Sequence, residues 1–154
     1  MEGKRATDYE GMLAEIQREI ARRERELYSD IVLREARNPS HVGRTPGADA
    51  HGLVHGWCGD TMEFYLRFAG EDIEEATFVT DGCGATVACG SMLCKMVTGM
   101  RLEEAEWVLP DDLVEALDGL PEESIHCADL AVSTLHNALL NWRVSKMQDE
   151  EQTE

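Results

Sequence analysis

The sequence predicts an α+β fold: a small antiparallel three-stranded sheet with helices packed on one face, and an extra helix at the N-terminus. Strand-like alternation is confined to the middle of the chain, and helical periodicity lies on both sides of it. The length of 154 residues, 43% of them hydrophobic, suits one domain with its own core.

The N-terminal part predicts two helices. A helical period covers 8–28, and a short second helix runs from about 29 to 37 and stops at the Asn-Pro-Ser of 38–40. We expect a charged helical extension over 1–27, a main domain over 28–146 and a frayed acidic tail over 147–154. The apolar stripe of the first helix can dock on the domain or bind a partner, and we expect it to dock. That stripe consists of Met12, Leu13, Ile16, Ile20 and Leu27.

Three strands follow a polar loop at 40–49. The strand-like runs cover about 50–57, 61–69 and 74–81, and short links between them indicate hairpins. In the second run, apolar Met62, Phe64 and Leu66 alternate with polar neighbours, so one face of the sheet is buried.

From residue 84 onward the pattern is helical. A helix over about 85–98 ends at Gly99, a short one covers 102–108, and a third begins at Pro110 and ends at Gly119. The last helix covers about 127–146, with an apolar face that begins at Cys127.

The net charge of −17, from 31 acids and 14 bases, argues against nucleic acid as a partner and favours basic partners. We see no signal peptide and no run of about 20 apolar residues, so we expect no membrane partner and a cytoplasmic location. Thiols stay reduced there, and an odd number of cysteines fits a disulfide framework poorly. The five cysteines therefore need another explanation.

Three cysteines lie at element boundaries: Cys58 in a turn between strands, Cys83 between the last strand and a helix, and Cys127 at the start of the last helix. We expect these side chains to be exposed, and we expect the helix N-termini to lower the pKa of Cys83 and Cys127. Cys89 and Cys94 lie inside a helix, where a buried cysteine acts as a small hydrophobe; the alternative for Cys89 is a helper thiol.

Two harder ligands accompany the boundary thiols, since Asp60 follows Cys58 by two residues and His126 precedes Cys127. Three thiolates with a carboxylate or an imidazole make a four-coordinate set for zinc, or for a 2Fe–2S cluster. Taken singly, Asp60 can organise a turn and His126 can bond the backbone. No pattern accompanies the other histidines, which we interpret as ordinary; they are His41, His51, His55 and His136.

The motifs Gly-Trp-Cys-Gly-Asp at 56–60, Asp-Gly-Cys-Gly at 81–84 and Ile-His-Cys at 125–127 resemble, in this order, those of the iron–sulfur scaffold family of IscU and the NifU N-terminal domain. The resemblance extends over about 28–143 and implies a SufE/NifU-like fold. It implies a transient 2Fe–2S cluster on Cys58, Cys83 and Cys127, with Asp60 keeping the cluster labile and His126 as the alternate ligand.

The resemblance also implies partners: a cysteine desulfurase that delivers persulfide sulfur, to Cys127 by our assignment, a donor of iron or electrons, and apo iron–sulfur acceptor proteins. The family's bacterial members bind a dedicated Hsp70-type chaperone through Leu-Pro-Pro-Val-Lys. Here residues 120–124 read Leu-Pro-Glu-Glu-Ser, which argues against that chaperone.

We therefore predict a scaffold that carries a cluster and is not an enzyme. One alternative is a SufU-like, zinc-dependent sulfurtransferase that accepts persulfide sulfur, and another is a structural zinc module. A thiol hydrolase is disfavoured, because adjacent residues on a helix point about 100° apart and align a nucleophile and its base poorly.

Overall fold

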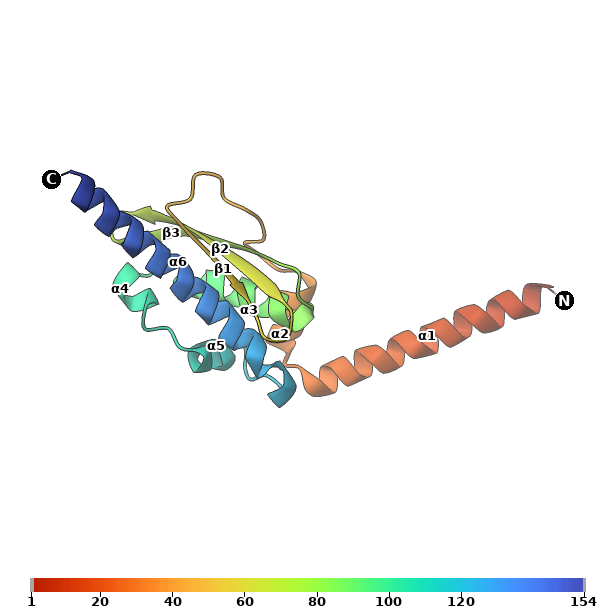
Figure 1. Cartoon of the computed structure of the whole chain (residues 1–154). Helices are drawn as coiled ribbons and strands as arrows, with labels where there is room; N and C mark the ends of the chain where they lie inside the picture. Colours follow the sequence, from red (N-terminus) through yellow and green to blue (C-terminus); the bar gives the residue numbers. More distant parts are fainter. Residues whose placement is uncertain (1, 154) are drawn as a thin grey trace.

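The computed structural model describes residues 2–153, and the side chains from Asp8 onward. Six helices, one 3-10 turn and three strands follow one another along the described chain. Figure 1 shows how the helices and strands are arranged. Their bounds are α1 Glu2–Leu27, α2 Asp30–Arg37, β1 Ala50–His55, β2 Thr61–Ala69, β3 Asp72–Thr80, α3 Gly84–Val97, α4 Leu102–Ala105, α5 Pro110–Ala116, η1 Glu122–Ser124 and α6 Ile125–Gln152.

The sheet is an antiparallel meander in the order β1-β2-β3. The predicted alternation in β2 is confirmed, since Met62, Phe64 and Leu66 are fully buried on one face of the sheet. A positive φ at Gly70 closes the second hairpin, where a residue with a side chain would be strained. The expected fold class is confirmed.

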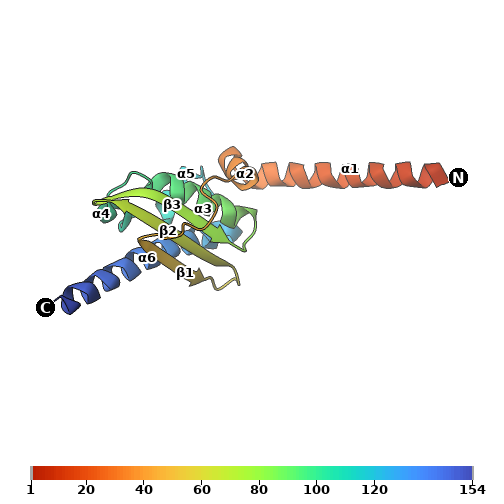
Figure 2. The ribbon, with the colours of Figure 1, turned by 90° about the horizontal axis from the view of Figure 1, so that it is seen from above.

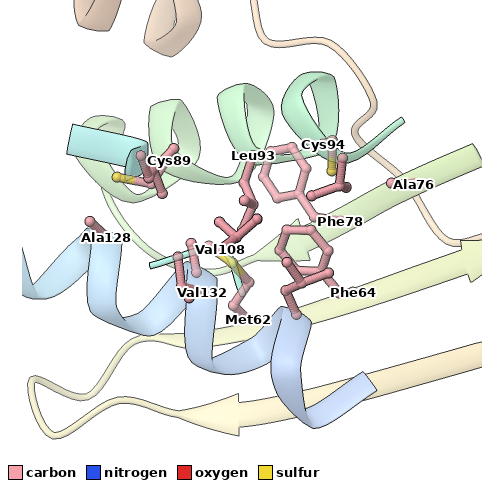
Figure 3. Close-up of a cluster of buried hydrophobic side chains, with 14 of the residues drawn as sticks. Met62, Phe64, Ala76, Phe78, Cys89, Leu93, Cys94, Val108, Ala128 and Val132 are labelled. Carbon is pink, nitrogen blue, oxygen red and sulfur yellow. The ribbon is translucent and has the colours of Figure 1, made fainter. Parts of the chain in front are cut away.

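The long helices α3 and α6 cover the buried face of the sheet (Figure 1). Figure 3 shows the resulting core, in which Phe64 and Phe78 of the sheet meet Leu93 of α3 and Val132 of α6. The two phenylalanine rings stack with centroids 6.3 Å apart. This core fixes both helix N-termini at the same end of the sheet.

A buried ionic contact holds α2 against α3. The Glu35 side chain is 0% exposed and accepts hydrogen bonds from Ser91 Oγ at 2.6 Å and from Lys95 Nζ at 2.5 Å. Burial works against ionisation of Glu35, but the hydrogen bonds from Lys95 and Ser91 together hold its pKa below the usual value. The charge is therefore retained inside the fold with its partners in place.

The helix α1 projects away from the domain and contacts α2 at its base (Figures 1 and 2). Its apolar residues remain exposed, Ile20 by 53% and Leu27 by 53%. The expectation that this stripe docks on the domain is wrong: its residues are exposed, and the hydrophobic core is built from the sheet and the other helices without them.

At the other end of the chain, α6 continues to Gln152. It includes most of the segment that we expected to be a frayed tail, because no helix breaker follows Trp142 and the helix simply extends into solvent. Within residues 2–153, no helix combines the length and the apolar composition that a membrane span needs.

Gly52→Ala tests the close packing of β1 on α6. A Cβ at Gly52 would lie 2.5 Å from the backbone nitrogen of Ala138 and 2.5 Å from the carbonyl oxygen of Thr134, and neither can move alone. We expect a loss of about 2 kcal/mol or more in the free energy of unfolding, measured with urea. Gly11→Ala is the matched control, because nothing lies within 4 Å of that position on α1. Equal stability of the two variants would contradict the packing.

Candidate functional site

The first corner of the site is the turn that joins β1 to β2. The amide of Gly56 donates to the carbonyl oxygen of Asp60 at 2.7 Å, and the amide of Gly59 donates back to Gly56 at 3.0 Å. Gly59 has a φ of +96°, which a residue with a side chain rarely adopts. This turn exposes Cys58 and directs the Asp60 carboxylate inward.

The second corner is the junction between β3 and α3, where the exposed Cys83 is the N-cap residue. The preceding Asp81 carboxylate accepts from the amide of Thr61 at 2.7 Å and ties this junction to the start of β2. Gly82 has no room for a side chain, because a Cβ there would lie 2.7 Å from the side chain of Thr86.

The third corner is the first turn of α6, which begins at Ile125 and so includes His126 and Cys127. Cys127 is buried, with 2% of its surface exposed, whereas we expected an exposed side chain. The expectation is wrong because the helix starts two residues earlier than predicted, which turns Cys127 onto the apolar face that packs on α3.

Thr86 joins the three corners. This residue is fully buried, and its hydroxyl lies 3.1 Å from Asp60 Oδ2, 3.4 Å from Cys127 Sγ and 4.0 Å from Cys83 Sγ. A hydroxyl has one proton to donate, so Thr86 can bond the carboxylate or the Cys127 sulfur, but not both at once.

Thr86 was not among the site residues predicted from the sequence. Its signal was present, because it is the third residue of the helix that follows Cys83, and a side chain there points back over the helix N-terminus.

His126 lies at the edge of the site, with Nε2 3.7 Å from Cys127 Sγ. Adjacent residues on a helix point about 100° apart and were expected to align poorly, but the side-chain rotamers of His126 and Cys127 bring this nitrogen and this sulfur into contact. The exposed Trp57 ring lies 5.3 Å from the His126 ring, at an angle of 58°. Trp57 was also overlooked, and it covers the imidazole from the side of the Cys58 turn.

Burial raises the pKa of the Cys127 thiol above its ordinary value. The hydrogen bond from Thr86 favours the thiolate, whereas negative charge at Cys83, Asp60 and Cys58 disfavours it. The expectation that a helix N-terminus lowers the pKa of this thiol is therefore wrong, because desolvation outweighs the helix dipole at so buried a sulfur. The same expectation for Cys83 stays a prediction.

The sequence-predicted ligands thus surround one point but do not close on it. Among residues 2–153, no three His, Cys, Asp or Glu side chains are close enough together to hold a metal ion as they stand. The Thr86 hydroxyl lies between Asp60 and Cys127, and Cys58 is exposed on its turn. Three sulfurs, one carboxylate and one imidazole nevertheless form a donor set that suits zinc or an iron–sulfur cluster.

The remaining cysteines lie in the core, and Cys89 is near enough to Cys127 and Cys83 for negative charge there to add to the rise of its pKa that burial causes. Cys89 and Cys94 are both 0% exposed in the core, which confirms that they are buried, and burial raises the pKa of each thiol. On the sheet, His51 contacts Glu63 at 3.1 Å and His55 contacts Thr61 at 2.7 Å, and His55 also lines a pocket together with Cys58 and His126. Glu122 and Glu123, which replace the basic chaperone motif, are exposed in η1.

Comparison with known proteins now decides the family. The family model described as the NifU-like N terminal domain matches residues 27–149. The chain belongs to this family. The match begins where α1 ends, so the NifU-like domain comprises the sheet, the three corners of the site and the helices from α2 to α6.

Relatives of this NifU-like domain carry informative names. The iron-sulfur cluster assembly scaffold protein IscU 1 of Archaeoglobus fulgidus is 38% identical over 117 residues, which cover 75% of this chain and 76% of that protein. The protein named iron-sulfur cluster assembly scaffold protein IscU in Escherichia coli K12 is 34% identical over 121 residues, 75% of this chain and 94% of that one.

A solved structure shows the same fold. The crystal structure of a nitrogen-fixing NifU-like protein (N-terminal) from Brucella abortus superposes with a TM-score of 0.64 at 17% identity. The superposition covers 76% of this chain and 94% of that chain.

The burial of the site predicts an order of thiol reactivity. In the folded chain at about pH 8, iodoacetamide should modify Cys58 and Cys83 first and leave Cys127 behind, because a buried thiol with a raised pKa holds little thiolate there. Peptide mass spectrometry after timed quenching measures each rate. In guanidinium all five cysteines should react alike, and folded Cys127 reacting as fast as Cys58 would show that its burial is wrong.

Proposed function

We propose that this chain is a scaffold on which a 2Fe–2S cluster is assembled and from which the cluster passes to acceptor proteins. The observation that carries the proposal is the meeting of Asp60, Cys83 and Cys127 around the hydroxyl of Thr86. The names of relatives at 34–38% identity support it, since they are iron–sulfur cluster assembly scaffolds.

The ligands we assign are Cys58, Cys83 and Cys127 as thiolates, with Asp60 or His126 in the fourth position. Thiolates are the usual ligands of such clusters, and a harder ligand in one place binds iron less strongly. The cluster is cargo, so the site must open and close around it. Zinc fits the same donors and competes for them in the absence of iron and sulfide.

Loading requires two movements from the described conformation. The Thr86 hydroxyl must rotate away from the space between Asp60 and Cys127, and the Gly56–Asp60 turn must bring Cys58 inward. The thiols lose their protons when they bind a metal. The free energy of metal binding offsets the cost of deprotonating Cys127, whose pKa is raised. Trp57, which is 86% exposed on this turn, moves with it.

Sulfur would arrive as a persulfide on a cysteine desulfurase. We assign Cys127 as the acceptor: its thiolate attacks the outer sulfur, the S–S bond breaks, and the thiolate of the desulfurase leaves. Because Cys127 is buried, this transfer must follow the opening of the turn. An iron donor supplies the metal and an electron donor supplies the electrons that reduce the sulfur to sulfide.

Delivery ends on an apo acceptor protein, and the route differs from one that uses a basic chaperone motif, because Glu122 and Glu123 are exposed there. In this role the chain carries a product and catalyses no reaction. Five free thiols fit a reducing compartment such as the cytoplasm.

Anaerobic reconstitution tests the proposed function. Iron, cysteine and a cysteine desulfurase should give the charge-transfer absorption of a 2Fe–2S cluster and acid-labile sulfide on the chain. Cys58→Ser, Cys83→Ser and Cys127→Ser should each lower the bound sulfide by about ten-fold, because each removes a thiolate ligand.

Cys94→Ala is the matched control. It also removes a thiol, but this thiol lies in the core among apolar residues and is not a proposed ligand. It should retain the cluster. A chain that binds zinc, never acquires sulfide and still accepts persulfide sulfur would sink the scaffold assignment.

Asp60→Ala tests the release step. Without the weaker oxygen ligand, transfer to an apo-ferredoxin should slow by about ten-fold, measured from the circular dichroism of the acceptor cluster. Asp129→Ala is the control, because it removes one charge from an exposed residue beside Cys58 and His126 without removing a ligand. Unchanged or faster transfer by Asp60→Ala would remove the role assigned to this residue.

A further inference from the structure

The exposed stripe on α1 has the spacing of a coiled-coil seam. Its apolar residues alternate at intervals of four and three, a 3.5-residue average that keeps one face toward a partner helix. Each is between 40% and 59% exposed, and α1 stands clear of the domain in Figure 2. These seam residues are Tyr9, Leu13, Ile16, Ile20 and Leu27; Met12 of the predicted stripe lies beside the seam.

The seam has one polar position. The alternation passes through Arg23, between Ile20 and Leu27, and its guanidinium bonds the Glu19 carboxylate of its own helix at 3.4 Å. A charged residue at one seam position specifies which partner fits, because a mismatched partner leaves it unpaired.

The residues that flank the seam argue against a second copy of this chain. In a parallel pair, Arg23 faces Arg23 and Glu19 lies across from Glu24 of the other copy. In an antiparallel pair centred near residue 18, Glu10 lies across from Glu24 and Glu19 from Glu19. Both arrangements bring like charges together, and two chains of net charge −17 also repel each other.

We propose that α1 is a docking helix for a basic partner protein. The partner presents an amphipathic helix whose apolar seam packs on the α1 stripe, with Lys or Arg along both flanks and a carboxylate opposite Arg23. Its basic flanks pair with the acids beside the seam, which are Glu10, Glu19, Glu24 and Glu26. The contacts of Glu19 with Arg22 and Arg23 do not compete strongly, since they are exposed and such pairs contribute little.

The docking surface reaches the neighbourhood of the thiol site. Glu24 belongs to the flank of the seam, and together with Tyr28 it also lines a cavity of about 270 Å³ whose far wall includes Cys83 and Gly84. A partner seated on α1 is therefore held beside an opening that leads to an exposed thiol. The proposal rests on α1 alone and stands whether or not a cluster forms at that thiol.

The test uses two synthetic helical peptides and the full chain. Both peptides carry leucine along a seam with one glutamate in it; the first has lysine at every flanking position and the second has glutamate there. The first should bind with a dissociation constant of about 10 μM or lower in about 50 mM salt, and more weakly in about 500 mM salt. The second should not bind, and titration calorimetry measures both.

Two triple variants locate the binding. Leu13→Ser with Ile16→Ser and Ile20→Ser removes the seam and should weaken the first peptide by about ten-fold or more. Ala14→Ser with Glu15→Ser and Arg18→Ser puts three serines off the seam at the same net charge, and should bind as the unsubstituted chain does.

Three outcomes overturn the proposal: no binding of the lysine peptide, equal binding of both peptides, or equal loss in both variants. Sedimentation supplies a fourth. If the unsubstituted chain dimerises at tens of micromolar and only the seam variant is monomeric, a second copy is the occupant. Cluster reconstitution of the seam variant is read separately, so failure of docking and failure of the scaffold assignment remain distinct.

Discussion

The packing of α3 and α6 on one face of the sheet is the contact on which the rest of the structure depends. Phe64 and Phe78 from the strands meet Leu93 and Leu135 from the two helices, and all are at most 1% exposed. Since Cys83 precedes α3 and Cys127 lies in the first turn of α6, this core fixes the separation of two thiols that are far apart in sequence. The turn with Cys58 and Asp60 lies outside this core, and none of its residues from 56 to 60 is buried.

That division explains why the site can be both ordered and open. Thr86 lies on a helix that the core holds rigidly, and its hydroxyl gives the Asp60 carboxylate and the Cys127 sulfur a partner in the absence of cargo. The Cys127 thiol is buried and the Asp60 carboxylate is half-buried, and leaving a buried polar group without a hydrogen-bond partner costs stability. The Thr86 hydroxyl can donate a hydrogen bond to either acceptor and so stabilises the site without cargo. That hydrogen bond is readily broken when the acceptors bind a stronger ligand.

Local sequence patterns predicted most of the helices and strands. They failed where packing between segments distant in the sequence determines the structure. The alternation around Phe64 and the apolar face behind Cys127 predicted the strands and the last helix, because burial imposes those periods directly. The burial of Cys127 depended on a helix start two residues earlier, and the Thr86 contacts depended on three segments meeting in space. The position of α1 was missed for a similar reason: an amphipathic stripe predicts that something covers it, and does not identify what does.

The answer to that last question follows from how α1 is attached. Its base meets α2, where Arg37 lies 3.5 Å from Glu24, and α2 is held on α3 by the buried Glu35 carboxylate, which Ser91 and Lys95 satisfy. The helix whose N-cap is Cys83 is thus two contacts away from the docking helix. A partner that gripped a flexible tail would be tethered near the site in no fixed orientation. A partner that grips α1 is oriented with respect to Cys83 through the junction of α1 with α2 and through the Glu35 contact between α2 and α3, which is costly to break because the buried carboxylate would be left without its partners. Orientation rather than proximity is what a thiol exchange between two proteins requires, since the attacking sulfur must approach along the S–S bond that breaks.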